Sequence, residues 1–459
     1  MENPQIAYFI GVGGAGMSAL ARYLVKEGYK VYGYDRTETS LTRQLVKEGI
    51  AITYNDSADA MPPEINISPE ELLLVITPAI PPTHPHLVEL KKLGHCPIKR
   101  AELLGRITQS TPTLAIAGTH GKTTTTAILA HIMDGTTKGC KAFIGGISTS
   151  TATNLYWSEN AEWTVVEADE FDRSFHALHP THAAITSLDP DHLDIYGDEE
   201  NFIDAFKIFS SQIKQTTIVH HEIVSHFRGL KGIETYGIET EGKNFTHSAS
   251  NINRIIGGYE FTLNISNKAE EIEKVVSNMM GMHNLENTIA AAALAYKAGV
   301  PTNIIVDRIS TFKGIYRRFQ IHTNTETSVY IDDYAHHPTE LKKTIEAVRE
   351  HFPGRHLTVI FQPHLFSRTK DQEQGFCQEL RKVDRLILLP IYAARENAIP
   401  GFNTQSLFEK ISHPHAKTST INSIFDILKA HPVDVLLSVG AGDIDLLVPD
   451  LKKWTSMDA

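Results

Sequence analysis

TLAIAGTHGKTTTT, residues 113–126, joins a short apolar run to a glycine-bounded loop and a series of hydroxyl residues. An apolar run that ends in glycine is typical of a buried strand that turns into a helix. Backbone N–H groups of Gly118–Thr124 could hold phosphate, Lys122 could reach its outer oxygens, and the Thr123 hydroxyl could bind Mg²⁺. The stretch therefore predicts a strand, a phosphate-binding loop and a helix, in that order.

This loop departs from the general phosphate-binding pattern at one position. The pattern G-x-x-x-x-G-K-[ST] requires a glycine where this chain has Ile116, so the loop is a shorter variant. The competing interpretation is a chance Gly-Lys-Thr-Thr sequence. The strand pattern before the loop and the helix pattern after it make that interpretation the weaker one.

A second glycine cluster, GVGGAG, occupies residues 11–16. It follows the apolar run Ile6–Ile10, precedes a helical pattern and matches G-x-G-x-x-G. Glycines at these positions allow a tight turn and let the backbone approach a diphosphate at the helix N-terminus. Asp35, 19 residues beyond Gly16, could bind a ribose hydroxyl. Alone, the motif would suggest a dehydrogenase, or a glycine turn that only packs helix on strand.

Composition restricts the class of protein. The net charge of −11 argues against nucleic-acid binding, because phosphate backbones are bound by clustered Lys and Arg. The three cysteines are far apart in sequence, which excludes a disulfide scaffold and a Cys-rich zinc site and suits a reducing compartment. The chain starts without a signal-like segment and has no apolar run of ~20 residues, so we expect a cytoplasmic protein without membrane insertion.

Strand and helix patterns alternate along the 459 residues, which is typical of α/β domains with parallel sheets. At about 150 residues per domain, this length suggests three domains. We expect α/β units over residues 1–108, 109–317 and 318–459.

Acidic and histidine-bearing segments follow two strands of the central unit. Glu167-Ala168-Asp169-Glu170 directly follows one apolar run, and Asp191-His192 lies a few residues after the next. Carboxyl ends of parallel strands meet at one edge of a sheet, the edge that also carries the phosphate loop. Glu167 and His192 are therefore candidate Mg²⁺ ligands. Taken singly, Glu167 could be a helix cap and His192 an ordinary loop histidine.

Three polar segments stand out in the last unit. Paired arginines in Tyr316–Phe319 lie at the domain junction, where the alternative is a solvated linker. Asp332–Glu340 follows one strand, and Gln362–His364 with Arg368 follows another. A strand end that carries His and Arg is more often functional than structural, because burying these groups without partners is costly.

Together and in this order, these segments resemble the Mur ligase family over essentially the whole chain. The resemblance rests on residues 11–17, 118–124, 167–170, 191–192, 283–287, 317–319 and 333–338. It implies a Rossmann-like UDP-sugar-binding domain, a central P-loop ATPase domain and a Rossmann-like C-terminal domain that binds the incoming amino acid. The glycine cluster resembles that of the branch that adds L-alanine to the lactyl carboxylate of UDP-N-acetylmuramate through an acyl phosphate, with release of ADP and phosphate.

The resemblance also implies roles for individual residues, with ATP and two Mg²⁺ ions as cofactors and a monomer or homodimer as the assembly. The UDP-sugar would be bound by Gly11, Gly13, Gly14, Ala15, Gly16 and Asp35. ATP would be bound by Gly118, Thr119, His120, Gly121, Lys122, Thr123, Thr124, His283, Asn287, Arg317 and Asp333. Metal ligands would be Thr123, Glu167 and His192, and Arg368 would bind the carboxylate of the amino acid. The catalytic groups would be Lys122, His192, Arg317 and His336.

One lysine gives a separate hypothesis. Sister ligases carbamylate a lysine about fifteen residues after the matching histidine and use it as a metal ligand. Lys207 lies 15 residues after His192, so we hypothesise that it approaches the metal site. The alternative is an ordinary lysine on the surface of a helix.

Three other functions compete with alanine addition. A murein-peptide ligase would attach a tripeptide to the same UDP-sugar and share the ATP site, so only the acceptor pocket separates the two. A nicotinamide-dependent dehydrogenase would use the first glycine cluster and leave the phosphate loop without a function. An inactive UDP-sugar-binding regulator is disfavoured because no metal or phosphate position is missing.

Overall fold

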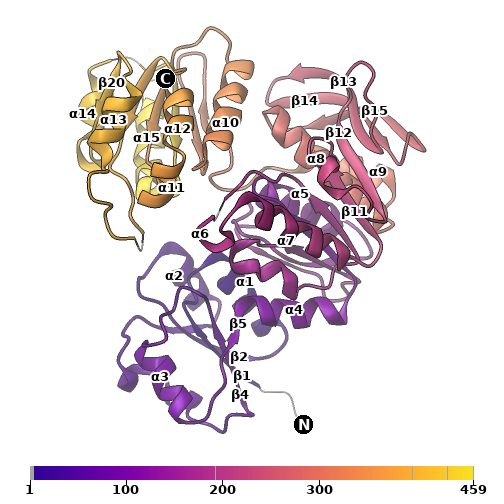
Figure 1. Ribbon diagram of the computed structural model, residues 1–459, viewed down its shortest axis with the longest axis vertical. Helices are drawn as coiled ribbons and strands as arrows, with labels where there is room; N and C mark the ends of the chain where they lie inside the picture. The colour runs from indigo at the N-terminus through magenta and orange to yellow at the C-terminus, as the bar shows by residue number, and fades with distance from the viewer. Residues whose placement is uncertain (1–4, 192, 395, 432, 458–459) are drawn as a thin grey trace. The chain divides into compact units, whose positions relative to one another are not determined.

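The structure is a computed structural model that describes residues 5–191, 193–394, 396–431 and 433–457 (Figure 1). It separates into two compact units along the chain. The first comprises Met1–Ile252, Phe261–Ser277 and Glu286–Lys313, and the second comprises Asn253–Glu260, Asn278–Leu285 and Gly314–Ala459. Among the helices of the described residues, none combines the length and apolar composition that a bilayer crossing requires.

The N-terminal sheet has the order β3-β2-β1-β4-β5, and each neighbouring pair is parallel. Its strands are β1 (Ile6–Ile10), β2 (Lys30–Tyr34), β3 (Ala51–Thr53), β4 (Leu72–Ile76) and β5 (Ile98–Lys99). Its helices are α1 (Ala15–Lys26), α2 (Ser40–Lys47), α3 (Pro85–Lys92) and α4 (Arg100–Ser110). Alternate strand residues enter different cores: Phe9 shares one core with Leu20 of α1, and Tyr8 shares another with Leu87 of α3.

The central sheet has the order β15-β14-β13-β12-β11-β10-β6-β9-β7-β8, with the antiparallel strand β8 at one edge. Its strands are β6 (Thr113–Ala117), β7 (Cys140–Phe143), β8 (Leu155–Trp157), β9 (Trp163–Glu167), β10 (His182–Ile185), β11 (Thr216–His220), β12 (Ile233–Ile238), β13 (His247–Ile255), β14 (Gly258–Ile265) and β15 (Glu270–Ser277). Its helices are α5 (Lys122–Asp134), α6 (Leu193–Tyr196), α7 (Glu199–Ser211), α8 (Met282–Lys297) and α9 (Thr302–Thr311). All five residues of β6 are buried, as expected for a central strand of a parallel sheet.

The C-terminal sheet has the order β16-β17-β21-β18-β19-β20, with β16 antiparallel at the edge and the other pairs parallel. Its strands are β16 (Gln320–Asn324), β17 (Val329–Asp333), β18 (Leu357–Phe361), β19 (Arg385–Leu388), β20 (Ala416–Thr418) and β21 (Val435–Val439). Its helices are α10 (Pro338–His351), α11 (Phe366–Asp371), α12 (Glu373–Leu380), α13 (Thr404–Ile411), α14 (Ile424–Lys429) and α15 (Val448–Met457). Separate cores on the two faces pair Val359 with Leu341 of α10 and Ile360 with Leu451 of α15.

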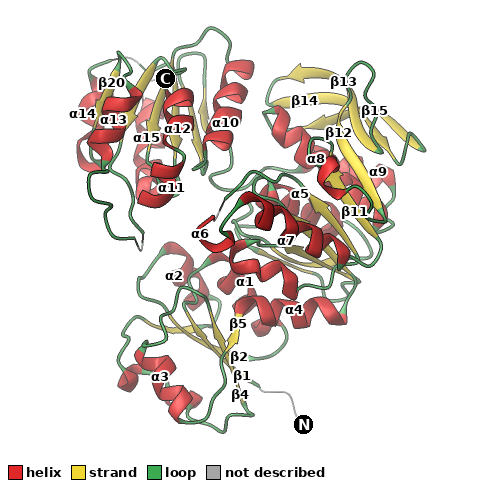
Figure 2. Cartoon of the chain, viewed as in Figure 1, coloured by secondary structure: helices red, strands yellow, loops and turns green. Residues whose placement is uncertain are grey.

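The predicted α/β class with parallel sheets is confirmed, and Figure 2 shows helices covering the sheets. The boundaries at residues 108 and 317 stay predictions.

Within the first unit, α4 packs closely against the 3₁₀ segment η3 (Phe171–Ala177) that follows the acidic segment after β9. A Cβ atom built on Gly105 would overlap the carbonyl oxygen of Ala177 and lie 3.2 Å from its carbonyl carbon. Gly105 is therefore the residue that lets α4 approach η3.

We expect Gly105→Ala to destabilise the protein, although Gly→Ala in a helix normally stabilises by about 0.5–1 kcal/mol. Overpacking against a backbone carbonyl costs about 1–3 kcal/mol, so Tm should fall by about 2–6 °C in a thermal unfolding scan. Glu102→Ala, on an exposed face of the same helix, serves as the control and should change Tm by under about 2 °C. An unchanged or higher Tm for Gly105→Ala would contradict the close packing.

Candidate active site

The loop between β6 and α5 is shaped by two glycines. Gly118 has φ of +126° and Gly121 has φ of +82°, which are conformations that residues with a Cβ atom rarely adopt. A Cβ on Gly118 would lie 2.8 Å from the backbone nitrogen of Ser187, and one on Gly121 would lie 2.5 Å from Oδ1 of Asn287. The glycines therefore supply both the turn and the close packing of the loop.

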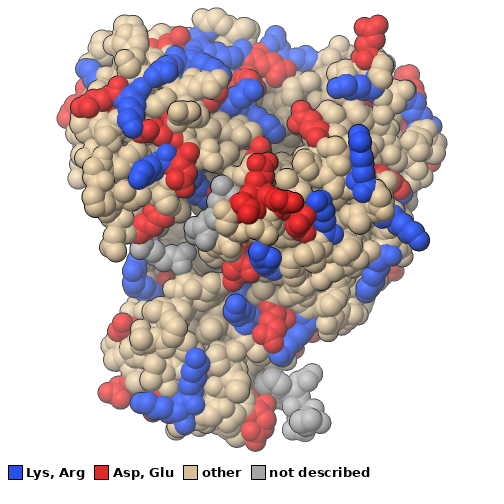
Figure 3. Space-filling view, viewed as in Figure 1, with Lys and Arg blue, Asp and Glu red and all other residues tan. Residues whose placement is uncertain are grey.

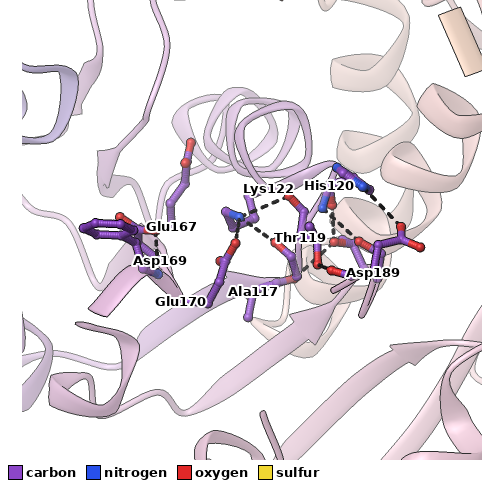
Figure 4. A network of polar contacts seen from close by, with 12 residues as sticks. Ala117, Thr119, His120, Lys122, Glu167, Asp169, Glu170 and Asp189 are labelled. Atoms are coloured by element: carbon purple, nitrogen blue, oxygen red, sulfur yellow. Dashed lines mark hydrogen bonds and ion pairs between the residues drawn. The ribbon is translucent and has the colours of Figure 1, made fainter. Parts of the chain in front are cut away.

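The segment after β10 holds this loop from one side (Figure 4). The Thr119 hydroxyl donates to the carbonyl oxygen of Asp189 at 2.6 Å, and the backbone N–H of His120 donates to Oγ of Ser187 at 2.8 Å. The imidazole Nε2 of His120 lies 3.2 Å from a carboxylate oxygen of Asp189. The Thr186 hydroxyl donates to the carbonyl oxygen of His120. These contacts fix the conformation of the loop.

Lys122, the first residue of α5, is partly buried, with 16% of its side chain exposed, and points back over the loop (Figure 4). Its Nζ donates to the carbonyl oxygen of Gly118 at 2.6 Å and to Oε1 of Glu170 at 2.8 Å. Burial opposes the charged ammonium, but the carboxylates of Glu170 and Asp169 outweigh this effect and raise the pKa of Lys122. Burial raises the pKa of Glu170 to about 7, although Lys122 acts in the opposite direction. The lysine therefore stays charged where phosphate oxygens are predicted to bind.

Thr123 and Glu167 form the next part of the site. The Thr123 hydroxyl donates to Oε2 of Glu167 at 3.3 Å, and the backbone N–H of Gly145 donates to Oε1 of the same carboxylate at 2.6 Å. A hydroxyl and a carboxylate are hard oxygen ligands of the kind that Mg²⁺ prefers, with water and substrate phosphate completing its shell. These two residues therefore fit a magnesium ion.

A metal cage made of protein groups alone does not occur in the described part of the chain, where no cluster of three or more His, Cys, Asp or Glu side chains could hold an ion. His192, the remaining predicted metal ligand, lies outside the described residues. Of the predicted set, the structure brings together Lys122, Thr123 and Glu167, and their roles stay predictions.

Two more predicted nucleotide residues lie on α8. Oδ1 of Asn287 accepts a hydrogen bond from the Thr125 hydroxyl at 3.2 Å and lies beside Gly121, so it contacts the start of α5. His283 belongs to the second unit, where its ring lies against Gly281. The adenine contacts predicted for both residues stay predictions.

The first glycine cluster links β1 to α1, and Gly11 has φ of +90°. The backbone N–H of Gly13 donates to Oδ2 of Asp35 at 2.7 Å, and the backbone N–H of Thr37 donates to Oδ1 at 3.3 Å. Asp35 therefore fixes the glycine loop. Its predicted contact with a ribose hydroxyl stays a prediction.

Sequence reasoning missed a polar network between α1 and the strand β8 region. Asn154 donates from Nδ2 to the carbonyl oxygen of Ala15 at 2.7 Å and to Oγ of Ser18 at 2.9 Å. Arg22, also on α1, donates to Oδ1 of Asn154 and pairs with Glu48 at 2.6 Å. The available signal was an arginine within the apolar pattern of α1, which is costly to bury without a partner.

Arg100 was missed as well. Its guanidinium lies beside Gly16, since a Cβ there would be 2.6 Å from Nη1, and Nη2 donates to Asp169 at 2.9 Å. Arg100 therefore connects the first glycine cluster with the acidic segment after β9. No local sequence pattern marks this residue.

In the second unit, Arg317 and Asp333 stabilise the junction before β16. Arg317 has φ of +61°, and its guanidinium donates to Oδ2 of Asp332 at 3.1 Å and to the carbonyl oxygen of Gly440 at 2.6 Å. The carboxylate of Asp333 accepts from the backbone N–H groups of Phe319 at 2.6 Å and Ala335 at 2.7 Å. Burial raises the pKa of Asp333 to about 6. The nucleotide contacts predicted for both residues stay predictions.

The carboxyl ends of β17 and β18 bring His336, His364 and Arg368 close together. The rings of His336 and His364 have centroids 6.1 Å apart, and Nδ1 of His336 lies 3.0 Å from the carbonyl oxygen of Tyr334. Burial lowers the pKa of His336, the carboxylate of Glu340 acts in the opposite direction, and the charge of Arg368 lowers the pKa further. The lowered pKa favours the neutral imidazole, which is the form that has a ring nitrogen free to accept a proton.

The hypothesis that Lys207 approaches the metal site is wrong in this structure. Lys207 lies on α7 with 42% of its side chain exposed, and its Nζ pairs with Asp204 on the same helix at 2.8 Å. Its neighbours Phe206 and Phe209 supply the buried face of α7, which leaves Lys207 at the surface.

Comparison with known proteins agrees with this geometry. Family models match residues 7–111 (Mur ligase family, catalytic domain), 116–295 (Mur ligase middle domain) and 317–442 (Mur ligase, glutamate ligase domain). A UDP-N-acetylmuramate–L-alanine ligase of Porphyromonas gingivalis is 42% identical over 450 residues, covering 97% of this chain and 98% of that protein.

Solved structures give the same result. A UDP-N-acetylmuramate-alanine ligase from Thermotoga maritima superposes with a TM-score of 0.82 at 26% identity, covering 98% of this chain and 99% of that one. A murein peptide ligase from Psychrobacter arcticus has the same fold, with a TM-score of 0.70 at 22% identity and 98% of each chain covered. Together with the three family models, these matches confirm the resemblance found in the sequence: the chain belongs to the Mur ligase family.

Proposed function

We propose that this chain is an ATP-dependent ligase that joins L-alanine to the lactyl carboxylate of UDP-N-acetylmuramate, a step of peptidoglycan precursor synthesis. The observation that carries the proposal is the convergence of Lys122, Thr123 and Glu167 at the carboxyl ends of β6 and β9. The near-complete length of the match to alanine-adding relatives supports the choice of substrates.

The first step forms an acyl phosphate. A carboxylate oxygen of the sugar acid attacks the γ-phosphorus of ATP, the bond from that phosphorus to the bridging oxygen breaks, and ADP leaves. Such a transfer depends on positioning and on neutralising charge on the phosphoryl oxygens. Lys122 supplies a fixed positive charge, and the N–H groups of the glycine loop supply hydrogen bonds.

Mg²⁺ supplies further charge neutralisation at the phosphates when it is bound. Thr123 and Glu167 would hold one ion, and by family resemblance His192 would serve a second. Gly145 keeps the Glu167 carboxylate oriented by donating its backbone N–H.

The second step forms the amide. The amine of alanine attacks the acyl carbon, and the tetrahedral intermediate expels phosphate as the carbon–oxygen bond breaks. The amine must be neutral to attack, so a base is required. His336, with its lowered pKa, is a candidate for that base alongside His192, and Arg368 is assigned to the carboxylate of alanine. Arg317, Asp333, His283 and Asn287 are assigned to the nucleotide by resemblance.

We assign the protein to the cytoplasm as a monomer or homodimer. Cys96, Cys140 and Cys377 are free thiols, which suits a reducing compartment.

Phosphate release from ATP and UDP-N-acetylmuramate, measured in parallel with L-alanine and with a murein tripeptide, tests the choice of acceptor. We expect phosphate release with alanine to exceed release with tripeptide by at least tenfold. Greater turnover with tripeptide would assign the chain to murein-peptide recycling instead. A change in NAD(P)H absorbance without phosphate release would indicate a dehydrogenase.

Lys122→Ala should abolish ATP-driven ligation, with turnover reduced by at least 10³-fold, because a preorganised charge at the transferring phosphoryl group is lost. The control is Lys207→Ala, which removes a surface lysine and should leave turnover within about twofold of wild type. Ligation by Lys122→Ala within tenfold of wild type would refute the assignment of the phosphate loop.

Glu167→Gln should keep the hydrogen bond from Gly145 but lose the charge that attracts Mg²⁺. We expect the Mg²⁺ concentration for half-maximal phosphate release to rise at least tenfold, as happens when a metal-site carboxylate loses its charge. Glu162→Gln, an exposed residue that pairs only with Lys138 among the described residues, is the matched control. An unchanged Mg²⁺ requirement would remove Glu167 from the metal site.

A further inference from the structure

A cavity of about 360 Å³ opens at the amino ends of strands in the second unit. β18, β19 and β20 are parallel, so this edge of the sheet lies opposite the edge that carries His336, His364 and Arg368. The titratable and charged groups that line the cavity are His356, Asp384, Arg385, His415, Lys417 and His431. None of them has a role in the reaction proposed above.

Arg385, the first residue of β19, is partly buried in the cavity wall. Its Nη1 is buried and has no hydrogen-bond partner within the described residues. Burial lowers the pKa of Arg385, because it disfavours the charged guanidinium. A buried guanidinium edge without an anionic partner is costly, so the site favours a ligand that accepts hydrogen bonds.

The carboxylate among the lining groups does not fill that role. Oδ2 of Asp384 accepts from Nη1 of Arg349 at 2.9 Å and from the backbone N–H of Leu357 at 2.7 Å. These partners lower the pKa of Asp384, against the opposing effect of burial. The charge of Asp384 is therefore balanced by Arg349, and Arg385 keeps an excess of positive charge.

Lys417 adds to this excess, and three imidazoles supply further ring N–H donors. Lys417 and the imidazoles of His356, His415 and His431 form no ion pair or side-chain hydrogen bond in the part of the chain that the structure describes. On the face shown in Figure 3, Lys and Arg side chains are interspersed with Asp and Glu over the region of β20, α12 and α13, where Lys410 pairs with Glu373.

A metal ion is the other ligand that histidines attract, and two observations oppose it. The described residues contain no cluster of three or more His, Cys, Asp or Glu side chains with metal-binding geometry. Arg385 and Lys417 would also repel a cation placed among the three imidazoles.

We propose that this cavity is a second ligand site, which binds a small anion with phosphate or carboxylate groups. A guanidinium presents parallel N–H donors that match such oxyanions in two-point contact, and its charge strengthens the hydrogen bonds. The cavity volume suits a small metabolite and lies at the low end of the range for ligand pockets. The site is independent of the phosphate loop and of the proposed ligase activity.

Isothermal titration of the full-length chain tests this site. Inorganic phosphate and citrate, titrated separately, distinguish a phosphate ligand from a carboxylate ligand. Every protein used in the titrations carries Lys122→Ala, which weakens phosphate binding at the glycine loop. We expect one of the two anions to bind, because Arg385 and Lys417 supply positive charge and the buried Nη1 of Arg385 supplies an unpaired donor.

Arg385→Gln should weaken that binding at least tenfold, and Arg385→Lys should give an intermediate loss because it keeps charge without the two-point contact. Arg43→Gln, an exposed arginine of the N-terminal sheet region, is the control and should leave binding unchanged. Arg385→Gln in an otherwise wild-type chain should retain full ligase turnover and its Tm within about 3 °C, which shows that the variant folds. Two results would overturn the proposal. One is that Arg385→Gln binds the anion as tightly as the protein that retains Arg385. The other is that neither anion binds at 10 mM, a concentration that would detect an affinity of ~1 mM.

Discussion

The parallel register of β6 with its two neighbours determines where the groups of the phosphate loop lie. Ile116 pairs with Glu167 of β9, and Ala117 pairs with Ile185 of β10. The carboxylate of Glu167 therefore emerges beside the start of α5, and the segment after β10 supports the loop from the other side. A shift of one residue would direct these side chains to the opposite face. The narrow space at Gly118, against Ser187, helps to hold the register in place.

Several charged groups at the sites of predicted chemistry are buried or partly buried and have hydrogen-bond partners. Lys122 and Glu170 form one such pair, while Asp333 is held by two backbone N–H groups. Removing one member of a buried pair leaves an uncompensated charge, which costs more than the pair itself contributes. These groups therefore hold their positions before substrates bind, which reduces the reorganisation that the reaction requires.

The sequence predicted those features that depend on local pattern. Apolar runs ending in glycine indicated β6 and β1, and polar residues at strand ends indicated Glu167 and His336. Features that depend on long-range pairing were not predictable, because Arg22 and Asn154 are 132 residues apart and neither belongs to a motif. Spacing alone gave a wrong hypothesis for Lys207. This lysine has the separation from His192 that sister ligases use, but the apolar face of α7 packs inward and leaves Lys207 on the exposed face.

The contact between Asn154 and the carbonyl oxygen of Ala15 has a consequence for the order of biosynthesis. Ribosomes release the N-terminal sheet well before residue 154 is polymerised, and domains generally fold as they emerge. Until then the side-chain amide of Asn154 cannot form its hydrogen bonds with Ala15, Ser18 and Arg22. Of the partners described above, Arg22 then has only the carboxylate of Glu48. The nascent N-terminal sheet and α1 therefore lack these hydrogen bonds until the segment between β7 and β8 has left the exit tunnel.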